Sequence, residues 1–283
     1  MYTSAEIRKI FKAHGLAPKK WMGQNLLVDE GFVKKIVQAA RISPGETVVE
    51  VGAGLGVLTG ELARRGADVV AMEIDSGFFH VLEEKFAALP QVELIHADAL
   101  KFDFRDLSSR IGKLRVVANL PYSISSRLIF TFLENRDIFK SLHILLQKEV
   151  AKRFIAPPGT KDYGVLTVLL GVSATVDLLF DIPAQSFYPV PEVVSTFVKV
   201  SFPEEPPVPV SDIRVLITLV KSSFSGRRKT LRNTLRNLPF PGLTPQVLAS
   251  AGEQAGIDLG RRGETLSPAE FARFADAVRF RLS

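Results

Sequence analysis

The sequence predicts an α/β fold followed by a small all-helical region, and three observations lead to this prediction. Between residues 47 and 202, short β-branched runs alternate with helical patterns, which is typical of a wound domain with a largely parallel central sheet. A proline-rich segment interrupts this pattern at residues 203–210, and no strand pattern returns after it. We therefore expect a first domain over residues 1–203, with a basic arm at 1–25, and a helical second domain over residues 210–283.

The elements of the two domains follow in chain order. The runs that predict parallel strands are TVVEV (47–51), DVVAMEI (68–74), VELIHA (92–97) and LRVVAN (114–119). Helical patterns at residues 57–66 and 78–89 separate the first three of these strands. Two later apolar runs, 174–183 and 193–202, could pair as neighbouring strands at one edge of the sheet. The helical patterns of the second domain lie at residues 213–224, 228–238, 245–256 and 268–282.

Composition excludes several classes of protein. The chain of 283 residues has no cysteine, which excludes disulfides, a thiolate nucleophile and cysteine-bound metal; we expect no metal site. The longest nearly uninterrupted apolar segment, residues 163–176, is shorter than the roughly 20 residues that a membrane-spanning helix needs. Charged residues interrupt the N-terminus, so it lacks the apolar region of a secretory signal. We expect a cytoplasmic protein.

Positive charge is concentrated at two places. The formal net charge is +6, and the sequence pI is near 9.5, which favours a polyanionic partner. The first cluster carries Arg8, Lys9, Lys12, Lys19 and Lys20 against Glu6. The second cluster has no acid and carries Lys221, Arg227, Arg228, Lys229, Arg232 and Arg236. Helical charge runs normally mix both signs, so the second cluster is the better candidate for binding phosphates, although a solvated surface is the alternative.

A glycine-rich turn follows the first predicted strand in the segment EVGAGLGVLTGEL. Gly52, Gly54 and Gly56 alternate there before a helix, and glycines let the backbone turn sharply and approach a ligand at the end of a first strand. The spacing does not match the dinucleotide fingerprint G-x-G-x-x-G. A pyrophosphate ligand is therefore disfavoured, and a turn without any ligand is the alternative.

Acidic residues end the next two predicted strands. Glu73 follows the glycine turn by some twenty residues, where a carboxylate can accept hydrogen bonds from both hydroxyls of a ribose. Asp75 is better explained as the cap of the following helix. Asp98 ends the third strand and could accept from an exocyclic amine, although a turn residue is an equally good explanation. Together with Gly52 and Gly54, these positions favour an adenosine pocket.

The fourth strand runs into Asn119-Leu120-Pro121-Tyr122, which places an amide and an aromatic ring on either side of a rigid step. The motif order resembles the ribosomal RNA adenine N6-dimethyltransferase family, and most closely its small-subunit branch. The motifs that carry this resemblance are GQNLL, EVGAGLG, MEID, HADAL, NLPY, FYPVPEV and RRKTLRN. NLPY at a strand end is the most specific of them, because it is typical of enzymes that methylate exocyclic amines.

The resemblance implies a Rossmann-like class I S-adenosylmethionine-dependent methyltransferase domain with a helical RNA-binding domain after it. It implies S-adenosylmethionine as methyl donor, and N6,N6-dimethylation of small-subunit rRNA or its precursor particle during ribosome biogenesis, by what we expect to be a monomer. The donor-binding positions carried over are Asn25, Leu27, Gly52, Gly54, Glu73, Asp98 and Asn119. The expected rRNA phosphate contacts are Lys221, Arg227, Arg228, Lys229 and Arg232. Leu26 departs from the family pattern, where phenylalanine is usual.

The residues fit this chemistry. The adenine amine is a poor nucleophile, so acceptors at Asn119 Oδ1 and the Leu120 carbonyl would hold its hydrogens, with Pro121 fixing their spacing. Tyr122 would offer a ring face to the target base. Phe187 would be the second stacking platform, with Tyr188 as the competing choice and a core role as the alternative for either ring. Stacking of roughly 1 to 3 kcal/mol per base could offset the few kcal/mol of base extrusion.

Two other functions remain open from the sequence. One is a large-subunit rRNA adenine methylase of the antibiotic-resistance type, against which RRKTLRN and the long helical tail argue. The other is a non-catalytic ribosome-assembly or nucleic-acid-binding factor that keeps the fold. The intact Glu73, Asn119, Pro121 and Tyr122 argue against this second function.

Overall fold

The computed structural model describes residues 4–17, 24–226 and 228–282. Contacts divide the chain into two compact units, each described here by itself. The first unit comprises residues 1–148 and 177–201, and the second comprises residues 149–176 and 202–283. The sequence predicts one boundary in the proline-rich segment, whereas the contacts also assign residues 149–176 to the C-terminal unit.

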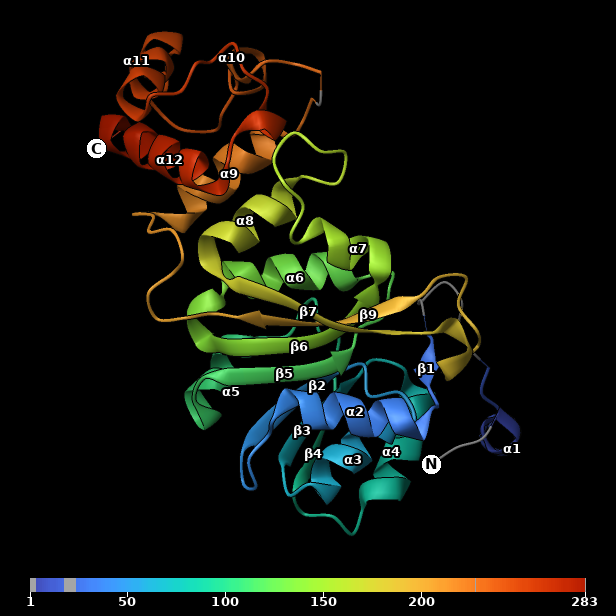
Figure 1. Cartoon of the computed structure of the whole chain (residues 1–283). Coiled ribbons are helices and arrows are strands. Elements are labelled where there is room, and N and C mark those ends of the chain that lie inside the picture. The colour runs from blue at the N-terminus through green and yellow to red at the C-terminus, as the bar shows by residue number, and fades with distance from the viewer. Residues whose placement is uncertain (1–3, 18–23, 227, 283) are drawn as a thin grey trace. The chain divides into compact units, whose positions relative to one another are not determined.

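A seven-stranded sheet forms the centre of the first unit (Figure 1). The strand order is β4-β3-β2-β5-β6-β9-β7, with bounds β2 (Thr47–Val51), β3 (Asp68–Glu73), β4 (Val92–His96), β5 (Leu114–Asn119), β6 (Phe139–Gln147), β7 (Thr175–Ile182) and β9 (Ser195–Ser201). The first five strands in this order, from β4 through β3, β2 and β5 to β6, run parallel to one another. Strand β9 pairs antiparallel with β6. The four predicted parallel strands are confirmed, as is the pairing of the two later runs, β7 and β9, at one edge.

Several helices of the first unit begin at aspartate caps that the sequence supplies. Their bounds are α1 (Ser4–Ala13), α2 (Glu30–Ala40), α3 (Val57–Arg64), α4 (Ser76–Phe86), α5 (Phe104–Ile111) and α6 (Ser125–Glu134), with 3-10 turns η2 (Arg136–Ile138) and η3 (Ala184–Ser186). Asp75 caps α4, as expected, by accepting hydrogen bonds from the backbone N–H groups of Gly77 and Phe78. Asp29 and Asp103 cap α2 and α5 in the same way.

The core of the first unit packs α2 and α3 against one face of the sheet. Val33, Ile36 and Leu62 are fully buried there against Val48 and Val117, which fits the helical spacing of apolar residues on α2 and α3. This packing holds the strands so that the carboxyl ends of β2, β3, β4 and β5 meet at one edge. The residues that follow those ends therefore lie close together in space.

A short two-stranded sheet joins distant segments of the first unit. Strand β1 (Leu26–Leu27) pairs antiparallel with β8 (Phe187–Tyr188), with Leu27 opposite Phe187. The pairing brings the GQNLL and FYPVPEV motifs together, so that two of the motifs behind the family resemblance are neighbours in space.

The second unit is helical. Its helices are α7 (Lys148–Arg153), which begins at the unit boundary, α8 (Val165–Ser173), α9 (Ile213–Ser223), α10 (Leu231–Thr234), α11 (Pro245–Ala255) and α12 (Pro268–Leu282), with a 3-10 turn η4 (Gly263–Thr265). The Tyr163 hydroxyl donates to the Leu266 carbonyl at 2.6 Å, and the Gly159 N–H donates to the Glu264 carbonyl at 2.7 Å. These bonds explain why residues 149–176 group with the C-terminal helices.

The helix predicted over residues 228–238 is wrong in extent. Only the four residues of α10 are helical there. The N–H groups of Leu231 and Arg232 donate to the carbonyls of Arg261 and Leu259, and Thr230 immediately before them is extended, so the helix begins only at Leu231. Among the described residues, no helix is both long enough and apolar enough to cross a membrane.

Candidate active site

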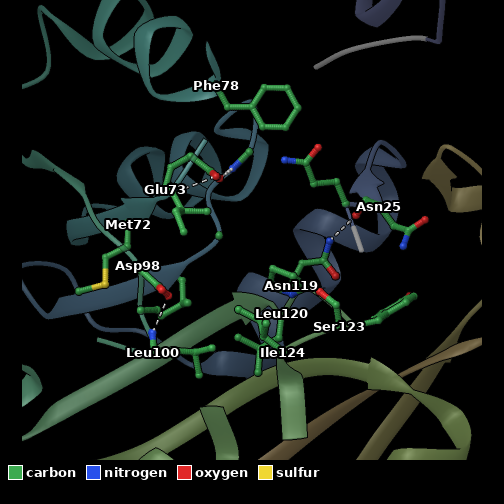
Figure 2. Close-up of a pocket in the computed structure, with 18 of the residues that line it drawn as sticks. Asn25, Met72, Glu73, Phe78, Asp98, Leu100, Asn119, Leu120, Ser123 and Ile124 are labelled. Atoms are coloured by element: carbon green, nitrogen blue, oxygen red, sulfur yellow. Dashed lines mark hydrogen bonds between the residues drawn. The ribbon is translucent and has the colours of Figure 1, made fainter. Parts of the chain in front are cut away.

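A pocket of about 320 Å³ lies in the first unit at the carboxyl ends of β2, β3, β4 and β5 (Figure 2). It is lined by Gln24, Asn25, Leu26, Val51, Gly52, Gly54, Met72, Glu73, Ile74, Phe78, Ala97, Asp98, Ala99, Leu100, Asn119, Leu120, Pro121, Tyr122, Ser123, Ile124 and Arg127. Most of the residues predicted from the four strand ends are therefore brought together in one cavity.

The glycine turn forms one wall of the pocket. Gly52 and Gly54 both adopt positive φ, +78° and +57°, a region that favours glycine. A Cβ at Gly54 would lie 2.7 Å from Leu26 Cδ2, and one at Gly52 would lie 3.2 Å from Pro121 Cδ. Glycine at these positions therefore lets two other walls of the pocket approach the turn.

Glu73 is buried, with 5% of its surface exposed, and it organises the backbone around it. Its Oε2 accepts from the Gly54 N–H at 2.8 Å, while Oε1 accepts from the N–H groups of Ile74 and Asp75, both at 2.9 Å. Burial raises the pKa of Glu73, and these backbone donors oppose the rise. Free acceptor capacity remains chiefly on Oε2, where a ligand hydroxyl could bind.

Asp98 acts as a turn residue and also lines the pocket, so its geometry is compatible with both of the roles that the sequence left open. Its Oδ1 accepts from the Leu100 N–H at 3.0 Å, which is the behaviour of a turn residue. The side chain is also half-buried and lines the pocket, and Figure 2 shows it beside Leu100. The second carboxylate oxygen can therefore serve a ligand amine.

Asn119 joins the end of β5 to the segment that precedes β1. Its Nδ2 donates to the Asn25 carbonyl at 2.7 Å, a bond visible in Figure 2. Its Oδ1 is buried and has no hydrogen-bond partner among the described residues. Because a buried polar atom without a partner is unfavourable, this oxygen is an acceptor held ready for a donor that enters the pocket.

The residues after Asn119 continue the wall of the pocket. Leu120 is buried, and the Pro121 carbonyl accepts from the Ile124 N–H at 3.1 Å, which closes the turn before α6. The Tyr122 hydroxyl lies 2.5 Å from Ser195 Oγ. Burial raises the pKa of Tyr122, and the hydrogen bond with Ser195 opposes that rise, so the phenol stays neutral.

Two predicted site residues do not reach the pocket. Phe187 is 1% exposed and Leu27 is 5% exposed, and both belong to the core cluster with Ile36 and Val48. Neither side chain lines the cavity. The expectation that the Phe187 ring offers a face to the base is therefore corrected, because β1–β8 pairing turns the ring into the core. Tyr188 is half-buried, with its ring 6.1 Å from that of Phe11.

The sequence analysis missed the apolar walls of the pocket. These side chains flank the predicted acids and the glycine turn, and they are Leu26, Met72, Ile74, Phe78 and Leu100. Ile74 is 49% exposed, which is unusual for a large apolar residue directly after a buried strand. An apolar residue immediately after the acid at a strand end was the signal that could have identified it.

The expected RNA contacts lie outside this pocket. Lys221, at the end of α9, and Arg228, Lys229 and Arg232 are exposed in the second unit. Arg227 lies outside the described residues, as do Lys19, Lys20 and Gly23 of the N-terminal segment. No group of His, Asp and Glu side chains in the described part of the chain could hold a metal ion.

The sheet order, the glycine turn and the acids at the strand ends define a class I S-adenosylmethionine-dependent methyltransferase. A family model described as ribosomal RNA adenine dimethylase matches residues 16–278. The chain belongs to the ribosomal RNA adenine dimethylase family, and it is an rRNA adenine dimethyltransferase.

Relatives and solved structures agree with this family. A protein of Geobacter metallireducens named ribosomal RNA small subunit methyltransferase A is 43% identical, over 94% of this chain and 98% of that protein. A protein of the same name from Shouchella clausii is 40% identical, over 98% and 95%. The crystal structure of a dimethyladenosine transferase from Plasmodium falciparum has a TM-score of 0.72 and 26% identity, over 88% and 95%. That of the 23S rRNA methyltransferase ErmE has a TM-score of 0.63 and 25% identity, over 90% and 100%.

Proposed function

We propose that this enzyme transfers methyl groups from S-adenosylmethionine to the N6 atoms of adenosines in small-subunit rRNA, giving N6,N6-dimethyladenosine during ribosome biogenesis. The small-subunit substrate is supported by relatives at 40 to 43% identity that carry a small-subunit name. The likeness to the 23S rRNA enzyme is weaker in sequence, at 25% identity. We further propose that the enzyme acts as a monomer in the cytoplasm on a precursor particle.

The pocket fits the methyl donor, which supplies an electrophilic methyl group. Glu73 and Asp98 offer carboxylate oxygens for ribose hydroxyls and an adenine amine, and Ile74 and Leu100 offer apolar surface for the adenine ring. Gly52 and Gly54 leave room for the backbone to approach the ligand. Asn25 closes the pocket through its carbonyl bond to Asn119.

The observation that carries the proposal is the unpartnered Oδ1 of Asn119. The amide cannot rotate freely, because Nδ2 is held by Asn25, so Oδ1 keeps a fixed direction. It would accept one N6 hydrogen of the target adenine, and the Leu120 carbonyl would accept the other, which orients the nitrogen lone pair for transfer. No strong base is needed, since the N6 proton becomes acidic only once the nitrogen carries the new methyl group.

Tyr122 would supply the ring face on which the extruded base stacks, and it lines the pocket next to Asn119. Phe187 supports this arrangement from the core by holding β8 against β1. In the second unit, exposed Lys221, Arg228, Lys229 and Arg232, with Arg227, would bind rRNA phosphates, which adds affinity without sequence choice.

The test replaces Asn119 and measures single-turnover methyl transfer to small-subunit particles that lack the modification. We expect Asn119→Ala to reduce the transfer rate by about 100-fold or more, because its acceptor acts mainly in the transition state. Donor affinity, measured by calorimetry, should change only a few fold.

Asn135→Ala is the matched control. Asn135 donates to the Thr131 carbonyl at 2.9 Å and does not line the pocket, so its variant should transfer methyl groups at the wild-type rate. Near wild-type transfer by folded Asn119→Ala would contradict the role of Oδ1. Transfer by the wild type to large-subunit rRNA in preference to small-subunit particles would contradict the proposed substrate.

A further inference from the structure

The hydroxyl of Tyr122 is anchored by a residue far along the chain. Tyr122 OH and Ser195 Oγ lie 2.5 Å apart, and the two residues are separated by 73 positions in the sequence. Ser195 has no exposed surface. A short hydrogen bond to a fully buried partner is directional and holds its two groups in one geometry.

The position of Ser195 in the sheet makes it a rigid support. It is the first residue of β9 and lies opposite Gln147 of β6 in an antiparallel register. Since β6 separates β5 from β9 in the sheet order, the bond with Tyr122 reaches over β6 from the turn after β5. The Lys148 N–H, which donates to the Val194 carbonyl at 2.9 Å, holds the chain immediately before Ser195.

The bond determines the orientation of an aromatic side chain that has two rotatable torsions. A tyrosine ring can turn about χ1 and χ2 unless packing or its hydroxyl holds it. Tyr122 is half-buried and lines the pocket. Neighbouring side chains therefore pack against only part of the ring, and packing alone does not fix its orientation. The phenol stays neutral because burial raises its pKa, and it therefore remains available for the bond with Ser195.

We propose that Ser195 is a positioning residue for methyl transfer, which orients the Tyr122 ring so that its face receives the target adenine. This inference rests on the proposed function, in which Tyr122 stacks on the extruded base. Ser195 touches neither the base nor the donor and acts through the Tyr122 hydroxyl. Ser195 lies in the strand that follows the FYPVPEV loop. This part of the chain therefore contacts the target site through the bond between Ser195 and Tyr122, whereas Phe187 of the loop is buried in the core.

The experiment compares Ser195→Ala, Tyr122→Phe and the double variant in single-turnover transfer to small-subunit particles, with donor and particle saturating. We expect each single variant to slow transfer about 5- to 20-fold, which corresponds to about 1 to 2 kcal/mol. Because both substitutions remove the same bond, the double variant should be no slower than the slower single variant. Calorimetric donor affinity should stay within twofold of the wild type.

Thr196→Val is the matched control. Thr196 is the next residue on β9, is 3% exposed, and its hydroxyl donates to Asp181 Oδ1 at 2.7 Å, so its loss also removes a partly buried side-chain hydrogen bond of the same strand. This variant should lose thermal stability and keep the wild-type transfer rate. A general structural role of β9 would instead slow all variants in proportion to their loss of stability.

Three outcomes overturn the proposal. They are a wild-type transfer rate in folded Ser195→Ala, fully multiplicative effects in the double variant, and an equal slowing by Thr196→Val. Failure of the proposed function is distinguished from these outcomes, because the wild type would then transfer no methyl group to the particle under the same conditions. Conversely, slow transfer by Ser195→Ala and Tyr122→Phe, with a wild-type control in Thr196→Val, supports the positioning role.

Discussion

Glu73 serves the backbone and the pocket at the same time. Its carboxylate accepts from the N–H groups of Gly54, Ile74 and Asp75, which fixes the glycine turn relative to the end of β3. A ligand hydroxyl at Oε2 would then meet a carboxylate that is already oriented. We therefore expect this one side chain to couple the shape of the turn to the affinity for the methyl donor.

Replacement of Glu73 by Gln tests that coupling. The amide keeps the size of the side chain, but an NH₂ group replaces one of the two accepting oxygens. That NH₂ group would face either the backbone N–H donors or the ribose hydroxyls and could not accept from them. Hydrogen bonds to charged groups contribute roughly 1.5 to 3 kcal/mol, so we expect the dissociation constant for S-adenosylmethionine to rise at least tenfold. Isothermal titration calorimetry measures this effect.

Glu83→Gln, on the exposed part of α4, provides the control for a general effect of charge and should bind the donor with wild-type affinity. An unchanged dissociation constant in folded Glu73→Gln would remove Glu73 from the donor site.

At the scale of an element, a lysine of α4 donates hydrogen bonds to the backbone of the glycine turn. Lys85 Nζ donates to the carbonyls of Leu55 and Gly56, at 2.8 and 2.9 Å. Burial lowers the pKa of Lys85 to about 8, opposed by the nearby Glu50. Glu50 is itself buried, which raises its pKa to about 8, and accepts from the Thr59 hydroxyl at 2.6 Å. Lys85 is thus a donor to both carbonyls, and the Gly56 carbonyl accepts from the Gly60 N–H as well.

We expect Lys85→Met to loosen the glycine turn. The carbonyls of Leu55 and Gly56 would lose the ammonium group as a donor, at a cost of roughly 1 kcal/mol or more in the free energy of unfolding, although Gly56 keeps its bond from the Gly60 N–H. The affinity for S-adenosylmethionine should fall several fold as well, because the turn carries Gly54 of the pocket wall. Thermal denaturation and calorimetry report the two effects separately.

Lys140→Met is the comparison, since Lys140 is 60% exposed on β6 and makes one long ion pair with Glu46. It should leave both measurements near wild type. If Lys85→Met also left donor affinity unchanged while lowering stability, the lysine would be a support of α4 alone, with no influence on the turn.

On the scale of the whole molecule, the excess of positive charge is divided between the two units. The exposed cations Arg8, Lys9 and Lys12 lie on α1 in the first unit. Arg228, Lys229 and Arg232 lie around α10 in the second unit, and no ion pair of theirs is found among the described residues. Such unpaired cations favour phosphate binding by the second unit, and none of them lines the pocket of the first unit.

Charge reversal separates that role from a solvated surface. We expect the double variant Arg228→Glu, Lys229→Glu to bind small-subunit particles more weakly and with a flatter salt dependence. Each lost phosphate contact removes about 0.7 to 0.9 from the slope of log affinity against log salt. Donor affinity should not change, because neither residue lines the pocket. Binding across a salt series measures the slope.

The matched control reverses Arg105 and Arg110, which are exposed in the first unit and paired with Asp137 and Glu93. Its salt slope should equal that of the wild type. If both double variants show the wild-type slope and affinity, residues 228 and 229 belong to a solvated surface, and the N-terminal cations become the leading candidates.

The sequence by itself determined the order of the strands along the chain and most of the pocket. In a parallel sheet the carboxyl ends of the strands meet at one edge, so Gly52, Glu73, Asp98 and Asn119 could be placed together from the positions of four strand ends. The spacing of apolar residues shows where each strand lies, and the residue that ends the strand is its neighbour in the chain. Both can therefore be identified from local sequence. The order of the sequence motifs was sufficient to predict the family, which the family model confirms.

Only the tertiary structure decided which partner each side chain meets. Phe187 lies in the core because β8 pairs with β1, more than 150 positions earlier in the sequence. Asn119 keeps a free Oδ1 because its Nδ2 meets Asn25, 94 residues away. The helix predicted over residues 228–238 does not start before Leu231, because the carbonyls of Arg261 and Leu259 accept the N–H groups of Leu231 and Arg232. Partners so distant in sequence leave no periodic signal, since their meeting depends on how whole elements pack.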